Sequence, residues 1–148
     1  ARGFFDSDGH VDIHGAIVLR QSVKGIKRIK RIEVVLDNLG LEYKIKRQSS
    51  KISLIVYSLT GFKENIGFIS KIKKNQLLEI IKCYKTKYDI TDIDDKIYLL
   101  CGSPVTKKEL MIKLKAKYAK ISNVLNRMIS EDKLKIIKRR PFTVVSIR

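Results

Sequence analysis

The first nine residues, Ala1-Arg-Gly-Phe-Phe-Asp-Ser-Asp-Gly9, decide the fold that we expect for the N-terminal part of this 148-residue chain. Gly3 carries no side chain, so a helix that contains it can be approached closely by a second helix. Asp6, Asp8 and Gly9 form an Asp-x-Asp-Gly sequence, which often ends a helix in a turn. We therefore expect a short helix that exposes Gly3 on one side and carries a carboxylate, Asp8, at its C-terminal end.

The hydrophobic pattern that follows predicts a mixed α+β unit. Residues 10–14 alternate between polar and apolar, which is typical of a half-exposed strand, and apolar residues recur every three or four positions from Val23 to Leu39, which indicates an amphipathic helix closed by Gly40. The remaining expected elements are strands at 16–20, 42–47 and 51–57, and helices around 62–68 and 75–84.

After residues 85–93, which lose periodicity, a second pattern begins. We expect a helix at 94–100, a helix opened by the capping box Thr106-Lys-Lys-Glu109, and a third helix at 118–130. Two strands, 133–138 and 142–147, then surround a basic turn at 139–141. The chain should therefore form two small domains, residues 1–88 and 89–148.

The charge balance points to a polyanionic partner. The chain has 32 Lys and Arg residues against 15 Asp and Glu residues, a net charge of +17. An excess of this size repels itself in the folded state and often persists where nucleic acid neutralises it. The alternative is a basic surface that is merely solvated.

Other classes of protein are disfavoured. No segment approaches the roughly 20 apolar residues that span a bilayer, and no lipidation signal is present. The two cysteines, Cys83 and Cys101, are too far apart for a zinc knuckle, and without a signal peptide they are expected to be ordinary thiols in a reducing compartment. We therefore expect a cytoplasmic or nucleoid-associated protein.

Residues 1–9 resemble the signature of LAGLIDADG homing endonucleases, especially its Arg-Gly-Phe-Phe-Asp form in inteins and archaeal enzymes. Gly3, Asp6, Asp8 and Gly9 match that signature, whereas Ala1 and Arg2 depart from its first two letters. The segment 61–68 and the lysine-rich helix after it resemble the end of such a half-domain. The resemblance, which covers about residues 1–84, implies an αββαββα half-domain whose strands form a saddle on DNA.

The resemblance also implies roles for individual residues. Asp8, with the backbone carbonyl of Ser7, would be a Mg²⁺ ligand, and Gly3 and Phe4 would lie in the interface with a second half. Asp6 would be a structural cap of the helix end. In the alternative reading, Asp6 and Asp8 end a helix and bind nothing.

Basic residues of the strands are the candidates for catalysis and DNA contact. The family often places a basic residue near the cleft, so Lys46 and Lys51, with Lys44 as a further candidate, are expected to assist cleavage; each could instead be a plain phosphate contact. Arg20, Lys44, Lys46 and Arg47 are expected to contact DNA. His10, Asp12 and His14 share one side of a strand and are read as a polar surface facing the groove, with a metal cluster as the alternative.

Residues 94–148 resemble a winged-helix DNA-binding domain in the order of their helices and in their basic wing. The resemblance implies that the third helix enters the major groove and that the wing touches phosphates. The implied contact residues are Lys117, Tyr118, Lys120, Ser122, Asn123 and Arg127 in the helix, and Lys138, Arg139 and Arg140 in the wing. The alternative is a winged helix that contacts protein.

One motif supplies one carboxylate, whereas cutting both DNA strands takes two. The second half is expected either upstream in the same protein, which the abrupt start at Ala1 favours, or in a second copy of this chain. The leading function is then a site-specific, Mg²⁺-dependent DNA endonuclease. The alternative is a DNA-binding transcription or replication factor that kept the fold without cutting, and protein splicing is disfavoured because no splice-junction residues are visible.

Overall fold

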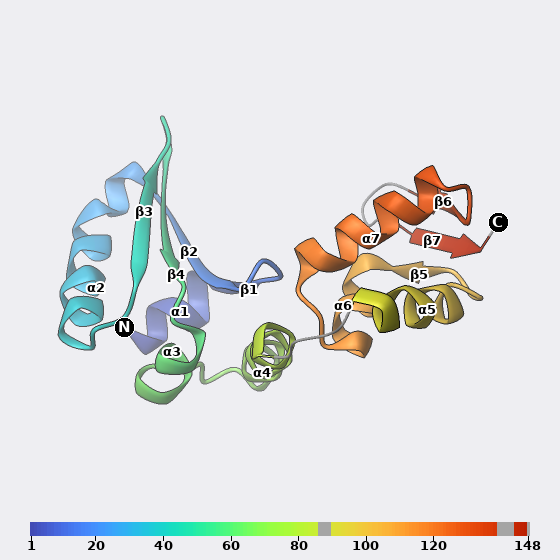
Figure 1. Cartoon of the computed structure of the whole chain (residues 1–148). Helices are drawn as coiled ribbons and strands as arrows, with labels where there is room; N and C mark the ends of the chain where they lie inside the picture. Colours follow the sequence, from blue (N-terminus) through green and yellow to red (C-terminus); the bar gives the residue numbers. More distant parts are fainter. Residues whose placement is uncertain (86–89, 139–143, 148) are drawn as a thin grey trace. The chain divides into compact units, whose positions relative to one another are not determined.

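The computed structural model describes residues 1–85, 90–138 and 144–147, and the chain divides into two compact units, residues 1–81 and 82–148 (Figure 1). The domain boundary expected between residues 88 and 89 lies outside the described residues. Both units combine helices with an antiparallel sheet, so the predicted α+β class is confirmed.

The first unit has the order of elements that the hydrophobic pattern predicts. These elements are α1 (Arg2–Asp8), β1 (Gly9–Asp12), β2 (Ala16–Ser22), a 3-10 turn (Val23–Gly25), α2 (Ile26–Asn38), β3 (Tyr43–Arg47), β4 (Lys51–Val56), α3 (Leu59–Asn65) and α4 (Lys71–Lys85). The division between the two units falls within α4.

The four strands of this unit form one antiparallel sheet in the order β1-β2-β4-β3. Alternate residues of the central strands, Ile17 and Leu19 in β2 and Ile52 and Leu54 in β4, are at most 1% exposed. Because α1 and α2 both contact β2, these side chains belong to the covered face of the sheet. Full burial of each such side chain contributes about 1.5–3 kcal/mol to folding.

Three aromatic rings hold the helices of the first unit together. Phe5 of α1 meets Phe62 of α3 edge to face with ring centroids 4.8 Å apart, and Phe62 lies 5.2 Å from Phe68. Phe5 and Phe62 are fully buried. Phe5 is therefore the buried side chain of the motif helix.

The second unit contains α5 (Ile90–Leu100), β5 (Val105–Thr106), α6 (Lys107–Leu114), α7 (Tyr118–Ser130), β6 (Leu134–Lys138) and β7 (Val144–Ile147). Its strands pair in the order β5-β7-β6. The short strand β5 was not anticipated, since two residues carry no periodicity, and α5 begins four residues before the predicted start at Asp94. The predicted capping box is present, with the Thr106 hydroxyl accepting from the Glu109 amide at 3.2 Å and the Glu109 carboxylate accepting from the Thr106 amide at 2.7 Å.

Neither cysteine forms a disulfide, both are buried in the second unit, and burial raises the pKa of Cys101 to about 11. A thiol with a pKa this high is a poor nucleophile and a poor metal ligand at neutral pH. Over the described part of the chain, we found no helix with both the length and the apolar character that a membrane crossing requires.

Candidate nucleic-acid interface

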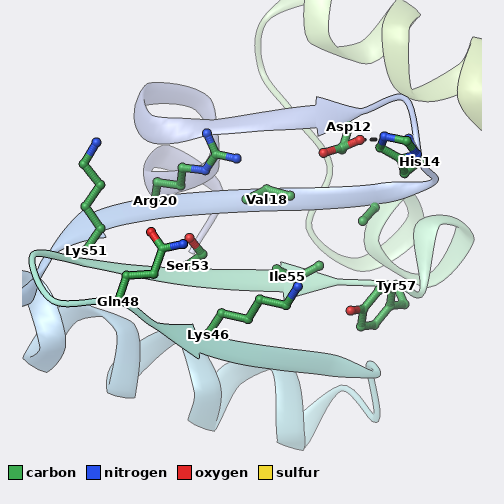
Figure 2. Close-up of a pocket in the computed structure, with 11 residues that line it drawn as sticks. Asp12, His14, Val18, Arg20, Lys46, Gln48, Lys51, Ser53, Ile55 and Tyr57 are labelled. Carbon is green, nitrogen blue, oxygen red and sulfur yellow. Dashed lines mark hydrogen bonds between the residues drawn. The ribbon is translucent and has the colours of Figure 1, made fainter.

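The face of the sheet opposite the helices carries a groove with a volume of about 520 Å³ (Figure 2). Paired residues of an antiparallel ladder share a face, and the pairs Arg20 with Ser53, Lys46 with Ser53, and Val18 with Ile55 all lie on this side. We call it the open face. The residues that line its groove are Asp12, His14, Ala16, Val18, Arg20, Lys46, Gln48, Lys51, Ser53, Ile55 and Tyr57.

The charges in this groove are not spread evenly. Figure 2 shows Arg20 and Lys51, together with Gln48 and Ser53, toward one end, Asp12, His14 and Tyr57 toward the other, and the Lys46 side chain reaching toward Ile55 between them. Arg20 and Lys46 flank Ser53 from the neighbouring strands β2 and β3. The cationic end can hold phosphate groups, and its long side chains can reach base edges.

The sheet separates Arg47 from the other candidate DNA contacts. Lys44 and Lys46 both lie on the open side of β3, since Lys44 pairs with Ile55 and Lys46 pairs with Ser53. Arg47 pairs with Ile52, which is 1% exposed on the covered face. A strand sends neighbouring residues to opposite faces, so Arg47 does not lie on the open face with the others.

Asp8 ends helix α1 and is exposed beside β2, where its carboxylate accepts a hydrogen bond of 2.5 Å from the Gln21 side-chain amide. Gln21 directly follows Arg20 in β2. Gln21 pairs with Ile52, so its side chain lies on the face opposite Arg20, and the motif carboxylate is tied to β2 from the covered side of the sheet.

The groups around Asp8 can be compared with the ligands that Mg²⁺ prefers. Among the described residues there is no group of three His, Cys, Asp or Glu side chains that could hold a metal ion. Mg²⁺, however, usually takes one or two carboxylates and completes its shell with water and substrate phosphates. The exposed carboxylate of Asp8 and the adjacent Ser7 carbonyl fit such a shared site, and they do not form a complete protein cage.

We predicted that Asp6 caps the end of its own helix, α1. In the structure it caps the start of helix α4 instead. Its carboxylate accepts hydrogen bonds from the backbone amides of Ile69 at 2.6 Å and Ser70 at 3.0 Å, just before α4 begins at Lys71. The hydrogen bond from Ser70 is the main cause that lowers the pKa of Asp6, with Ile69, Lys73 and Lys74 adding to it. The periodicity of the sequence could not reveal this contact, because the partners are more than 60 positions apart.

Lys73 is a site residue that the candidates from the sequence do not include. Its ammonium donates to the carbonyl oxygens of Gly9 at 2.7 Å and Phe5 at 3.4 Å, and also to that of Asp6. A cation at the C-terminal end of a helix neutralises the unpaired carbonyls there. Lys73 therefore holds the turn that carries Asp8, and the only signal for it is the run of lysines at 71–74.

The polar residues around β1 serve the turn of the hairpin. The Asp12 carboxylate accepts the backbone amide of His14 at 2.8 Å, which stabilises the turn (Figure 2). Desolvation lowers the pKa of His10, with the positive charge of Arg20 as a second cause. A neutral His10 is thus favoured in the folded protein, and the structure places no metal cluster at this hairpin or elsewhere in its described part.

The side of helix α1 that we expect to contact a second half is uncovered. A Cβ atom built on Gly3 would meet nothing within 4 Å, and Phe4 is 36% exposed. The guanidinium of Arg28 lies 5.8 Å from the centroid of the Phe4 ring. Gly9, in contrast, has no room for a side chain, since its Cβ would lie 2.6 Å from the Phe5 carbonyl oxygen.

In the second unit, α7 gathers several of the predicted contacts on one side. Lys120, Asn123, Val124 and Arg127 line a shallow groove of about 560 Å³. Arg127 is engaged within the unit, because it forms ion pairs with Asp94 and, at 3.9 Å, with Glu131.

The other predicted contacts of this unit have mixed positions. Lys117 precedes α7 and lies 5.8 Å from the centroid of the Tyr84 ring, Tyr118 is half-buried, and the Ser122 hydroxyl accepts from the Lys107 ammonium at 3.0 Å. Lys138 ends β6, and its side chain, like Arg139 and Arg140, lies outside the described residues.

Comparison with known proteins finds a similar segment in a much longer protein. No family model matches the chain. A DNA polymerase of Methanocaldococcus jannaschii is 38% identical over 108 residues, a match that covers 62% of this chain and 6% of the polymerase. The chain therefore corresponds to a small segment of this curated relative.

Proposed function

We propose that this chain binds double-stranded DNA on the open face of its four-stranded sheet and, together with a second half of the same type, cleaves it as a LAGLIDADG endonuclease. The observation that carries the proposal is the position of Asp8. This carboxylate is exposed at the end of a helix with an uncovered Gly3, and it is hydrogen-bonded to Gln21 on the covered side of β2, next in sequence to Arg20, which enters the groove from the open side.

The arrangement of the strands supports DNA as the partner. The major groove is wide enough to admit a β-ribbon, and the open face presents two ribbons side by side, β1-β2 and β4-β3. One face of the sheet is covered by helices and the other carries Arg20, Lys46 and Lys51 in a groove. A duplex would neutralise these charges without displacing any part of the core.

The second unit supports the same partner. The order helix, strand, two helices, then a two-stranded ribbon resembles that of a winged helix, in which α7 would be the helix that enters the major groove. Lys120 and Asn123 lie together on α7. This unit would lengthen the recognised site, and Arg127 would contribute only after exchanging its carboxylate partners for phosphate.

The comparison also supports an origin as an inserted endonuclease. A match to 6% of a DNA polymerase is what an insertion such as an intein would produce. The motif form at residues 1–9 resembles that of intein endonucleases, which fits this origin.

Each residue of the site has a defined part in the proposed reaction. The phosphates would be bound by Arg20, Lys46 and Lys51. Asp8 would be the ligand of the metal ion, and Lys73 would keep the end of helix α1 in place. Mg²⁺, when bound, would supply charge stabilisation for phosphodiester hydrolysis. Because each half carries one such carboxylate, cutting both strands requires two α1 helices at one interface.

The test is a cleavage and binding assay on a randomised duplex library with Mg²⁺. Asp8→Asn should reduce cleavage at least about a hundredfold and leave DNA affinity within a few fold, since only a ligand carboxylate is lost. Asp95→Asn, which removes an exposed carboxylate from α5, is the matched control. Equal cleavage by the wild type and the Asp8→Asn variant would contradict the assignment.

A second candidate function is a DNA-binding regulator that does not cut. It is favoured by the single carboxylate motif. Specific binding without cleavage at any protein concentration, also after joining to an upstream half, would favour this candidate.

A further inference from the structure

Two apolar side chains lie in the middle of the open face. Val18 of β2 and Ile55 of β4 are direct partners in the ladder, and both line the groove, where Figure 2 shows them between Arg20 and Tyr57. Their outer partners in the same row are His10 of β1 and Lys44 of β3, and Val18 is only 5% exposed. Ile55 is half-buried and reaches the surface of the groove.

Rows of different composition lie on the two sides of this apolar pair. The next row along the strands contains Arg20, Ser53 and Lys46, and the row on the other side contains Ala16 and Asp12. Residues two positions apart on a strand are separated by about 6.6 Å. This distance is about two base-pair steps of a duplex, whose rise is about 3.4 Å.

The chemistry of these rows matches different base edges. Thymine is the natural base that presents a methyl group in the major groove, where it makes apolar contacts, whereas guanine presents two acceptors to Arg or Lys. An isoleucine offers no hydrogen bond, so a guanine, adenine or cytosine edge placed against it would lose its water without replacement.

We propose that Ile55, flanked on β2 by Val18, contacts the C5 methyl group of a thymine, about two base pairs from the place where the row of Arg20, Ser53 and Lys46 meets the duplex. This inference rests on the proposed binding of DNA to the open face. It adds a sequence preference that depends on one side chain, whereas the phosphate contacts of the groove are indifferent to sequence.

The experiment first selects duplexes that the full chain binds, and then replaces each thymine of the selected site singly with deoxyuridine, which removes only the methyl group. At one position the replacement should weaken binding about three- to fivefold, the value expected for one buried methyl group. The other thymines of the site should respond less.

Two variants assign this sensitivity to the groove. Ile55→Ala should bind the thymine and uracil duplexes equally. If this variant folds poorly, Ile55→Thr, which keeps the β-branched shape, is used for the same comparison of the two duplexes. Val34→Ala, which shortens an exposed side chain on α2, is the matched control and should keep the preference for thymine.

The outcomes separate this inference from the proposed function. If no duplex is bound, DNA binding and the inference fall together. If duplexes are bound but no thymine methyl matters, or if its effect persists in Ile55→Ala, the inference is overturned while DNA binding stands.

Discussion

Asp6 and Asp8 are two positions apart in one helix, yet the structure gives them different tasks. Asp6 accepts the amides of Ile69 and Ser70 and so joins α1 to the start of α4. Asp8 is exposed and accepts only the Gln21 side chain among the hydrogen bonds described for it. Only Asp8 therefore has a carboxylate that a metal ion or a phosphate-bound water could reach.

The first prediction concerns Asp6 and pH. Folding lowers the pKa of Asp6 below its ordinary 3.8, so its contribution to stability is present above pH 3.8 and is lost as the pH falls through the folded-state pKa. Asp6→Asn should lower the Tm at pH 7, and the difference from the wild type should shrink below pH 3.8. Thermal melts across this range test it, with Glu64→Gln, an exposed carboxylate in α3, as the control.

The second prediction concerns Lys73. Lys73→Met keeps most of the aliphatic stem and removes the ammonium that binds the carbonyls of Phe5, Asp6 and Gly9. The turn that carries Asp8 should then shift, and cleavage should fall on the order of tenfold to a hundredfold while DNA affinity changes little. Single-turnover cleavage and binding titrations separate these effects. Lys74→Met is the control, and an equal loss of cleavage in that variant would point to charge alone.

At the scale of elements, α1 combines an anchored side with an uncovered one. Phe5 is buried against Phe62, whereas Gly3 and Phe4 face outward. A helix of seven residues with one buried side chain gains little stability by itself. Its exposed side is therefore available for a partner helix without cost to the core.

The third prediction tests that exposed side. Gly3→Ala should raise the stability of the unpaired chain by about 0.5 kcal/mol, since its Cβ meets nothing within 4 Å, and Gly3→Leu should not lower the Tm. Both should weaken pairing with a second half, the leucine variant more strongly, in sedimentation and cleavage measurements. Gly9→Ala is the contrast, because its Cβ would collide with the Phe5 carbonyl and lower stability instead.

At the scale of the whole molecule, the net charge of +17 governs association with DNA. Each phosphate contact releases condensed counterions, so the logarithm of the binding constant should fall steeply with the logarithm of salt concentration, with a slope of about −0.9 per contact. For six or more contacts, affinity should drop about a thousandfold between about 50 and 200 mM salt.

The fourth prediction assigns part of that slope to the open face. Arg20→Gln should reduce its magnitude by about one, whereas Lys27→Gln on α2, outside the open face, should leave it unchanged. Fluorescence titrations at several salt concentrations measure both slopes. Equal effects of the two variants would mean that the charge of the whole surface, and not the groove, binds the duplex.

Much of the organisation of this chain is readable from short-range patterns. The period of the apolar residues predicts the order helix, two strands, helix, two strands, helix, and the spacing of Thr106 and Glu109 predicts a capping box that the structure contains. These features depend on neighbours within one or two turns, so local sequence is sufficient to specify them.

Contacts between distant residues were decided only by the packed structure. Lys73 meets the end of α1 across more than 60 positions, and the ladder that pairs Arg47 with Ile52 assigns Arg47 to the face opposite Lys44 and Lys46. A single step in register would exchange these faces. Because such contacts depend on how separate strands and helices pack, no local pattern of residues contains them.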